Sequence, residues 1–148
     1  LRQIQERVEQ AGAAAGITFR FDRIGISPNT LDAHRLIRWA GGQGEDVQQD
    51  VVTRLFEAYF IEGRNIGERA VLAELAAVAG MDGAVVAGLL EEDADRATVE
   101  QEIDMARRMG VTGVPCFILA GQHALMGAQP PSVIAEAIGR IAAARVGA

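Results

Sequence analysis

The composition places the chain among globular proteins and disfavours several kinds of partner. Its 148 residues are enough for one domain with a substantial hydrophobic core. Hydrophobic residues make up 49% and charged residues 23%, which is the balance of a folded chain rather than a disordered one. The net charge of −6 works against nucleic acid and anionic membranes, and the apolar runs are too short to span a bilayer. We therefore expect no nucleic-acid partner and no membrane.

Cysteine and histidine are scarce. The single cysteine, Cys116, excludes a disulfide between two residues of the chain, and two histidines without clustered ligands do not match a zinc pattern. We therefore expect no bound metal. All 14 basic residues are arginines, which we interpret as a feature of solvated helix faces.

The first part of the chain is predicted to be mainly helical. Apolar residues recur at helical spacing over residues 1–15, and Gly16 ends that pattern. Residues 17–21 alternate between apolar and polar side chains, which indicates a short strand or an extended segment. A broad apolar face predicts a further helix over residues 45–60.

Between these segments, a turn at residues 27–30 leads into another helix. Either Asn29 or Thr30 is expected to cap its first turn, because both side chains accept hydrogen bonds from free backbone N–H groups. The helix is predicted to run to about residue 40 and to end in Gly41 and Gly42.

The remaining chain passes from helices to a hairpin and back to a helix. Asp82 is expected to cap one of the helices, and Gly121 lies in the turn of the hairpin. Two short strands are marginal alone, so their apolar side chains are expected to be buried on both faces of a larger sheet. The predicted helices cover residues 68–79, 82–90, 98–109 and a segment opening at residues 129–132, and the predicted strands cover residues 116–120 and 122–126.

Three strings of residues carry a resemblance to a known family. GVTGVPCFIL begins at Gly110 and places Pro115 at the entrance of a strand, where a residue without an N–H cannot join the ladder. Together with PNTLDAHRLIRWA from Pro28 and LFEAYFIEGRNI from Leu55, it resembles the DsbA superfamily and its FrnE-like branch. That branch is related to 2-hydroxychromene-2-carboxylate isomerase and kappa-class glutathione transferase. The resemblance extends over residues 16–141.

The resemblance implies a fold. It is an α/β, thioredoxin-like fold with a helical insertion, in which a βαβ half precedes the insertion and a ββα half follows it. The chain would form one DsbA-like domain, residues 1–148. It would supply a helix of the insertion (1–15), the rest of the insertion (16–109) and the ββα half (110–148). The βαβ half, with its Cys-x-x-Cys pair, is expected upstream of Leu1.

The resemblance also implies a site. The peptide bond between Val114 and Pro115 would be cis and would leave the backbone of Val114 free to pair with a substrate chain or with glutathione. Val114 and Pro115 are therefore the candidate catalytic positions. The candidate substrate-binding residues are Asn29, Thr30, His34, Gly113 and Cys116.

Several of these residues have a simpler interpretation. Cys116 is either a resolving or regulatory thiol or, as we favour, a small buried hydrophobe, because no cation lies near it in the sequence. Asn29 and Thr30 are helix-capping residues in either case, and His34 is either half-exposed or close to a redox centre.

The function implied is that of a thiol–disulfide oxidoreductase. It needs no bound cofactor, and glutathione or a thioredoxin-type protein would reduce it. Its substrate would be a disulfide-containing protein or a small-molecule thiol, its location the cytoplasm, and its helical faces are compatible with a homodimer. The alternatives are a glutathione-dependent isomerase or transferase and a redox-inactive binding module.

Overall fold

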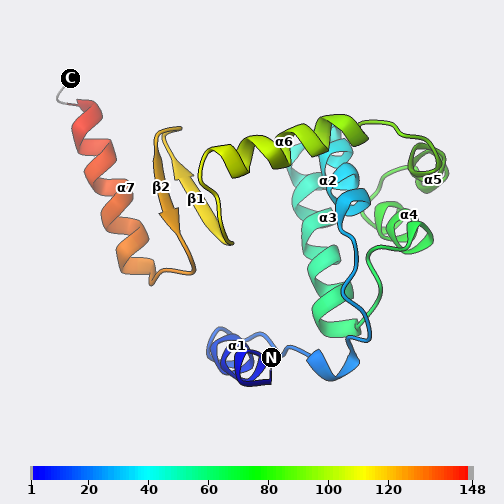
Figure 1. The fold of residues 1–148 in the computed structure, drawn as a ribbon, viewed down its shortest axis with the longest axis horizontal. Helices are drawn as coiled ribbons and strands as arrows, with labels where there is room; N and C mark the ends of the chain where they lie inside the picture. Colours follow the sequence, from blue (N-terminus) through cyan, green and yellow to red (C-terminus); the bar gives the residue numbers. More distant parts are fainter. Residues whose placement is uncertain (1, 147–148) are drawn as a thin grey trace. The chain divides into compact units, whose positions relative to one another are not determined.

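Helices make up most of the computed structural model, which describes residues 2–146. The chain divides into two compact units, Leu1–Gln101 and Glu102–Ala148, and Figure 1 labels their helices and strands. The first unit holds the helices α1 (Arg2–Ala14), α2 (Leu31–Gln43), α3 (Glu45–Glu57), α4 (Arg69–Val78) and α5 (Gly83–Glu91) and the start of α6 (Arg96–Arg108). A 3-10 turn, Phe21–Arg23, precedes α2, and a π-helical turn, Ala58–Glu62, extends α3.

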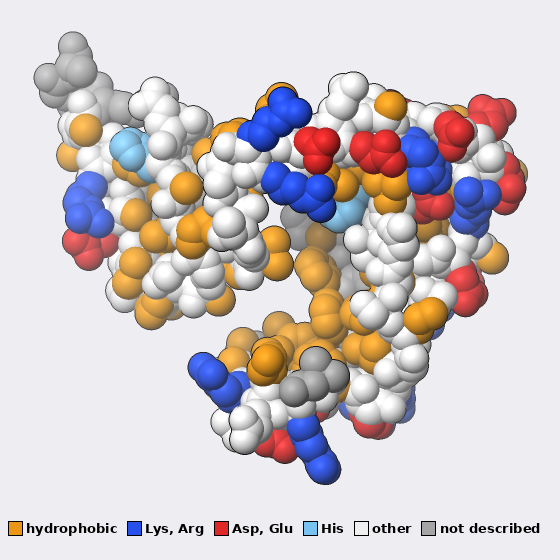
Figure 2. Space-filling view, in the orientation of Figure 1, with side chains coloured by type: hydrophobic (Ala, Val, Ile, Leu, Met, Phe, Trp, Pro, Cys, Tyr) orange, Lys and Arg blue, Asp and Glu red, His pale blue; other side chains and the backbone are white. Residues whose placement is uncertain are grey.

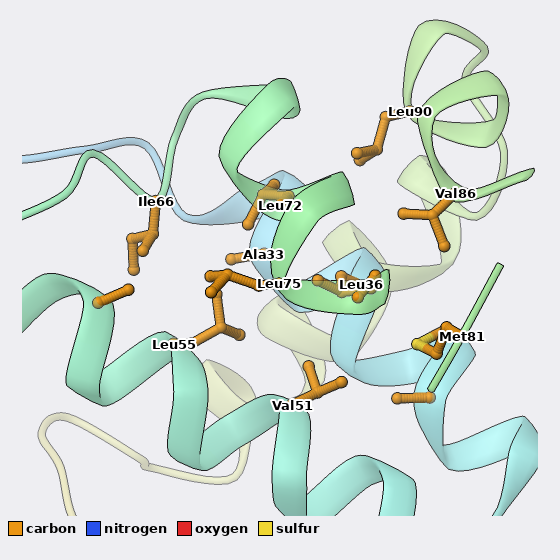
Figure 3. Packing of buried hydrophobic residues seen from close by; sticks show 13 residues of the cluster. Ala33, Leu36, Val51, Leu55, Ile66, Leu72, Leu75, Met81, Val86 and Leu90 are labelled. Carbon is orange, nitrogen blue, oxygen red and sulfur yellow. The ribbon is translucent and has the colours of Figure 1, made fainter. Parts of the chain in front are cut away.

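The hydrophobic core of the first unit lies among α2, α3, α4 and α5. Leu36, Val51, Leu72 and Leu90, one from each of these helices, have no exposed surface (Figure 3). Each of these helices buries one apolar stripe, so the apolar residues of each helix recur in the sequence at the helical period. Asp82 caps α5 as predicted, since its carboxylate accepts hydrogen bonds from the N–H groups of Ala84 and Val85.

Arg35 on α2 is a charged residue with no exposed surface. Its guanidinium donates to the carbonyl oxygens of Leu89 at 2.6 Å, Glu92 at 2.7 Å and Ala94 at 2.7 Å. These carbonyls belong to the end of α5 and the turn that follows it, where helix geometry leaves acceptors unpaired. The prediction that the arginines occupy solvated helix faces is wrong for this residue.

Asp32 neutralises this buried guanidinium. Its Oδ1 lies 2.8 Å from Arg35 Nη1, and its carboxylate also contacts Arg69 at 3.3 Å and Arg96 at 3.5 Å. Burial of the carboxyl opposes its ionisation, but the hydrogen bonds from Arg35 and Arg69 outweigh that effect and lower the pKa of Asp32 below its ordinary value of 3.8. The Asp32–Arg35 pair therefore connects α2 to α4 and α6 as well as to the end of α5.

Of the two alternatives predicted for residues 17–21, the strand is absent, and another local prediction differs from the structure. Residues 17–20 form neither helix nor paired strand, and the side chain of Phe19 packs against that of Phe60, with ring centroids 5.7 Å apart. The helix α2 continues through Gly41 and Gly42 and ends at Gln43, before Gly44, whose φ is +144°. Gln48 explains the continuation, because its amide lies over Gly41 and donates to the carbonyl of Ile37 at 3.1 Å.

The second unit contains the hairpin. Strands β1 (Cys116–Leu119) and β2 (His123–Met126) pair antiparallel, with Cys116 opposite Met126, and helix α7 (Pro131–Val146) follows. The turn passes through Ala120 and Gly121, both left-handed, with φ of +53° and +72°. Phe117 and Ile118 are 37% and 47% exposed, so the described residues do not bury both faces of the hairpin, and its membership in a larger sheet stays a prediction.

Replacing Arg35 by methionine is expected to lower the free energy of unfolding by about 3 kcal/mol, because the variant leaves three carbonyls without their donor and removes the guanidinium nearest to the partly buried Asp32 carboxylate. Arg54→Met is the matched control, since Arg54 pairs with Asp50 at the same 2.8 Å but is partly exposed. Its cost should stay below about 1 kcal/mol. Urea unfolding followed by circular dichroism measures both, and equal costs would contradict the role given to Arg35.

The lowered pKa of Asp32 predicts that the protein loses stability as the pH falls into the acidic range. In the unfolded chain Asp32 takes up a proton near its ordinary pKa of 3.8, while the folded protein holds it ionised to lower pH. Its stabilisation is thus complete above that value and is lost as the pH falls through the lower folded-state pKa. Unfolding curves between about pH 7 and pH 2 should show wild type and Asp32→Asn converging below about pH 5. A difference that stays constant across this range would refute the account.

Candidate functional site

An apolar groove of about 360 Å³ lies on the first unit, between α2 and the α3 segment with its π-helical extension. Ala33, His34 and Ile37 face it from α2 at helical spacing. The opposite wall repeats the same spacing and is made by Val52, Leu55, Phe56, Tyr59 and Phe60. Hydrophobic side chains reach the surface of this unit in Figure 2.

Three aromatic rings belong to this wall of the groove. Phe60 stands between its neighbours, with centroid distances of 4.8 Å to Tyr59 and 6.0 Å to Phe56. The Tyr59 hydroxyl donates to the carbonyl of Ile26 at 3.3 Å, and Phe56 is 60% exposed. Trp39, in contrast, packs against the core and donates to Asp95 at 2.8 Å. The groove therefore carries exposed aromatic surface on a wall fixed by packing.

The polar groups of the groove gather where α2 begins. Ser27, Thr30 and His34 line it there, and His34 is exposed. Asn29 rather than Thr30 supplies the capping bond, because its Oδ1 accepts from the N–H of Leu31 at 3.0 Å while Thr30 makes no such bond. Because Asn29 makes the capping hydrogen bond, the Thr30 hydroxyl at the mouth of the groove is not engaged in capping the helix.

The second unit presents the loop before β1. The Val114–Pro115 peptide bond is cis, and Val114 is 90% exposed. The carbonyl of Pro115 accepts from the N–H of Gly127 at 2.8 Å, so Pro115 is fastened to the hairpin while residue 114 is not. Among residues 2–146, the backbone hydrogen bonds include none from or to Val114. Its N–H and C=O are thus available to an added strand.

Cys116 follows directly, as the first residue of β1. It is half-buried and lines a hollow of about 100 Å³ together with Met126, its partner across the hairpin. The structure therefore agrees only in part with a buried hydrophobe. Within the described residues, no three His, Cys, Asp or Glu side chains gather in a way that could hold a metal ion.

The predicted site residues fall into two groups, one in each unit. Thr30 and His34 share the groove with Asn29 beside them, and Gly113 lies in the loop with Val114, Pro115 and Cys116.

The sequence motifs did not identify Pro28, Val52 or Ile66 as groove residues. For Val52, the spacing of i, i+3, i+4, i+7 and i+8 on one helix face was the available signal.

The helical groove and the proline loop before a ββα segment agree with a thioredoxin-type protein that carries a helical insertion. The family model of the DSBA-like thioredoxin domain matches residues 1–139, and the chain belongs to that family. It is also similar to the uncharacterized protein YwbO of Bacillus subtilis (strain 168), with 28% identity over 138 residues. That match covers 90% of this chain and 66% of the relative, so the chain spans slightly less than two thirds of the relative's length.

The match confirms the resemblance to the DsbA superfamily. The described residues are mostly helical with one small antiparallel sheet in the C-terminal unit, which agrees with a DsbA-like thioredoxin fold that carries a helical insertion. Across the described residues, no helix has the length and apolar character needed to cross a membrane.

Proposed function

We propose that this chain is the substrate-facing part of a thiol–disulfide oxidoreductase of the FrnE-like type. The observation that carries the proposal is the loop before β1, where Pro115 is bonded to Gly127 and Val114 presents an unpaired backbone. An extended substrate segment can add to such a backbone through its own main-chain groups, which gives affinity without demanding a particular sequence. Membership in the DSBA-like family supports this chemistry.

The reaction needs two further sulfurs. A Cys-x-x-Cys pair upstream of Leu1 supplies them in this proposal, because the chain itself contains one cysteine. One thiolate attacks the substrate disulfide, forms a mixed disulfide and releases the other substrate sulfur as a thiolate. The second cysteine then attacks the mixed disulfide, so that the substrate leaves as a dithiol and the enzyme becomes oxidised. Glutathione or a thioredoxin-type protein returns the enzyme to the dithiol.

The residues of this chain bind and orient the substrate in that scheme. Gly113, Val114 and Pro115 hold the substrate strand, and Cys116 lies next to it on β1. Asn29, Thr30 and His34 are the proposed binding residues of the helical unit. The proposed substrate is a disulfide-containing protein or a small-molecule thiol, the proposed location is the cytoplasm, and a homodimer is compatible with the helical faces.

Two other functions have a specific observation in their favour. The groove of about 360 Å³ has the size of a small-molecule site, which favours a glutathione-dependent isomerase or transferase of the 2-hydroxychromene-2-carboxylate isomerase or kappa type. The single cysteine favours a redox-inactive binding module. The three differ in the nucleophile that accompanies this chain.

Peptide mapping of the full-length gene product by mass spectrometry separates these functions. A Cys-x-x-Cys pair preceding residue 1 is the expected result, and the pair should cycle between dithiol and disulfide forms in glutathione buffers. A lone cysteine or a serine in its place would favour the isomerase or transferase. A mature protein without any such nucleophile would favour the binding module and overturn the enzyme assignment.

Pro115→Ala tests the docking role in the full-length enzyme. Alanine brings an N–H to the entrance of β1, and this donor lets the loop backbone pair within the hairpin instead of with a substrate. The KM for a disulfide peptide should rise about tenfold while the helical circular dichroism signal stays the same, a change equivalent to about one hydrogen bond. Val114→Ala is the control, because the exposed side chain is shortened and the backbone is kept. An unchanged KM in Pro115→Ala would remove the docking role.

A further inference from the structure

We propose that the groove between α2 and the α3 segment binds an uncharged, flat aromatic molecule of low molecular weight. Its volume of about 360 Å³ lies within the usual range for small-molecule sites, which are concave and mainly apolar with a few polar groups. The groove has this composition, with nine apolar or aromatic residues and three polar ones: Pro28, Ala33, Ile37, Val52, Leu55, Phe56, Tyr59, Phe60 and Ile66, and Ser27, Thr30 and His34.

The absence of charge in the lining selects an uncharged ligand. None of the described residues that line the groove is Asp, Glu, Lys or Arg. A charged ligand would lose its hydration there without gaining a counter-ion, and burial of an unpaired charge is costly. The hydroxyls of Ser27 and Thr30 and the imidazole of His34 offer hydrogen bonds at one end, where α2 begins. The ligand therefore carries one polar, uncharged group at that end and an apolar body beyond it.

The exposed aromatic wall selects a flat body. Phe56 lines the groove yet leaves 60% of its surface exposed, and it lies almost parallel to Phe60, with an angle of 23° between their planes. A further ring in the groove can stack on or pack edge-on against these rings, which adds to the gain from removing their surface from water. A saturated body of the same size would lose the contribution from packing of one aromatic ring on another.

This proposal depends on the helical unit alone. It needs neither the loop at Val114 nor a cysteine pair, so failure of the oxidoreductase chemistry would leave it intact. Conversely, an empty groove would leave the docking loop and its disulfide chemistry untouched.

A pair of probes with matched shape tests the charge selectivity. Naphthalene-2-carboxamide is neutral and 2-naphthoate is anionic, and both present the same flat body. Titration of the labelled chain by amide NMR at about pH 8, where the carboxylate is ionised, should give saturable shifts for the carboxamide at residues of the groove. The naphthoate should bind at least about tenfold more weakly. No binding of the carboxamide at millimolar concentration, or equal or tighter binding of the naphthoate, would overturn the proposal.

Variants locate the probe. Val52→Trp places a large side chain in the groove and should abolish carboxamide binding, whereas Val78→Trp makes the same change at a 56% exposed position outside it and should not. Phe56→Ala provides a second route that does not disturb the core, because the ring is largely exposed, and it should weaken binding about three- to tenfold. Circular dichroism checks that each variant is folded. Carboxamide binding that survives both Val52→Trp and Phe56→Ala would place the probe elsewhere and overturn the assignment.

Discussion

The helical unit depends on the hydrogen bonds and the ion pair of the buried Arg35 guanidinium. Taking a charge out of water is costly, and the structure offsets that cost with a carboxylate from Asp32 and three carbonyl acceptors. The same contacts fix α2 against the end of α5. Because α2 contributes Leu36 to the core and His34 to the groove, a single anchored helix sets both the packing and the candidate site.

Much of the helical architecture could be predicted from local patterns. Apolar spacing located the helices, Asp82 marked the start of α5, and Gly121 marked the hairpin turn. Predictions failed where a contact distant in the sequence overrides the local rule. Gln48 packs on Gly41 and lets α2 continue through a glycine pair, and only the strand alternative for residues 17–21 fails, because Phe19 packs on other aromatic rings.

The candidate site could be predicted only in part, for a similar reason. Short motifs identified His34 and the loop at Pro115, since those residues are recognisable in the sequence itself. They did not identify the groove wall, because Val52 and Ile66 are ordinary apolar residues whose role arises from the packing of α2 against α3. Nor did they show that Arg35 is buried, because its acceptors are backbone carbonyls more than fifty positions away, as with Leu89.

The central claim is that the stable part of this chain is the helical unit organised around Arg35. Native-state hydrogen exchange of individual amides tests it most directly, because amides that open only by global unfolding exchange most slowly. The account predicts the slowest exchange in α2 around Leu36 and faster exchange in β1 and β2, whose faces are partly exposed. Exchange in the hairpin that is as slow as in α2, or slower, would contradict it.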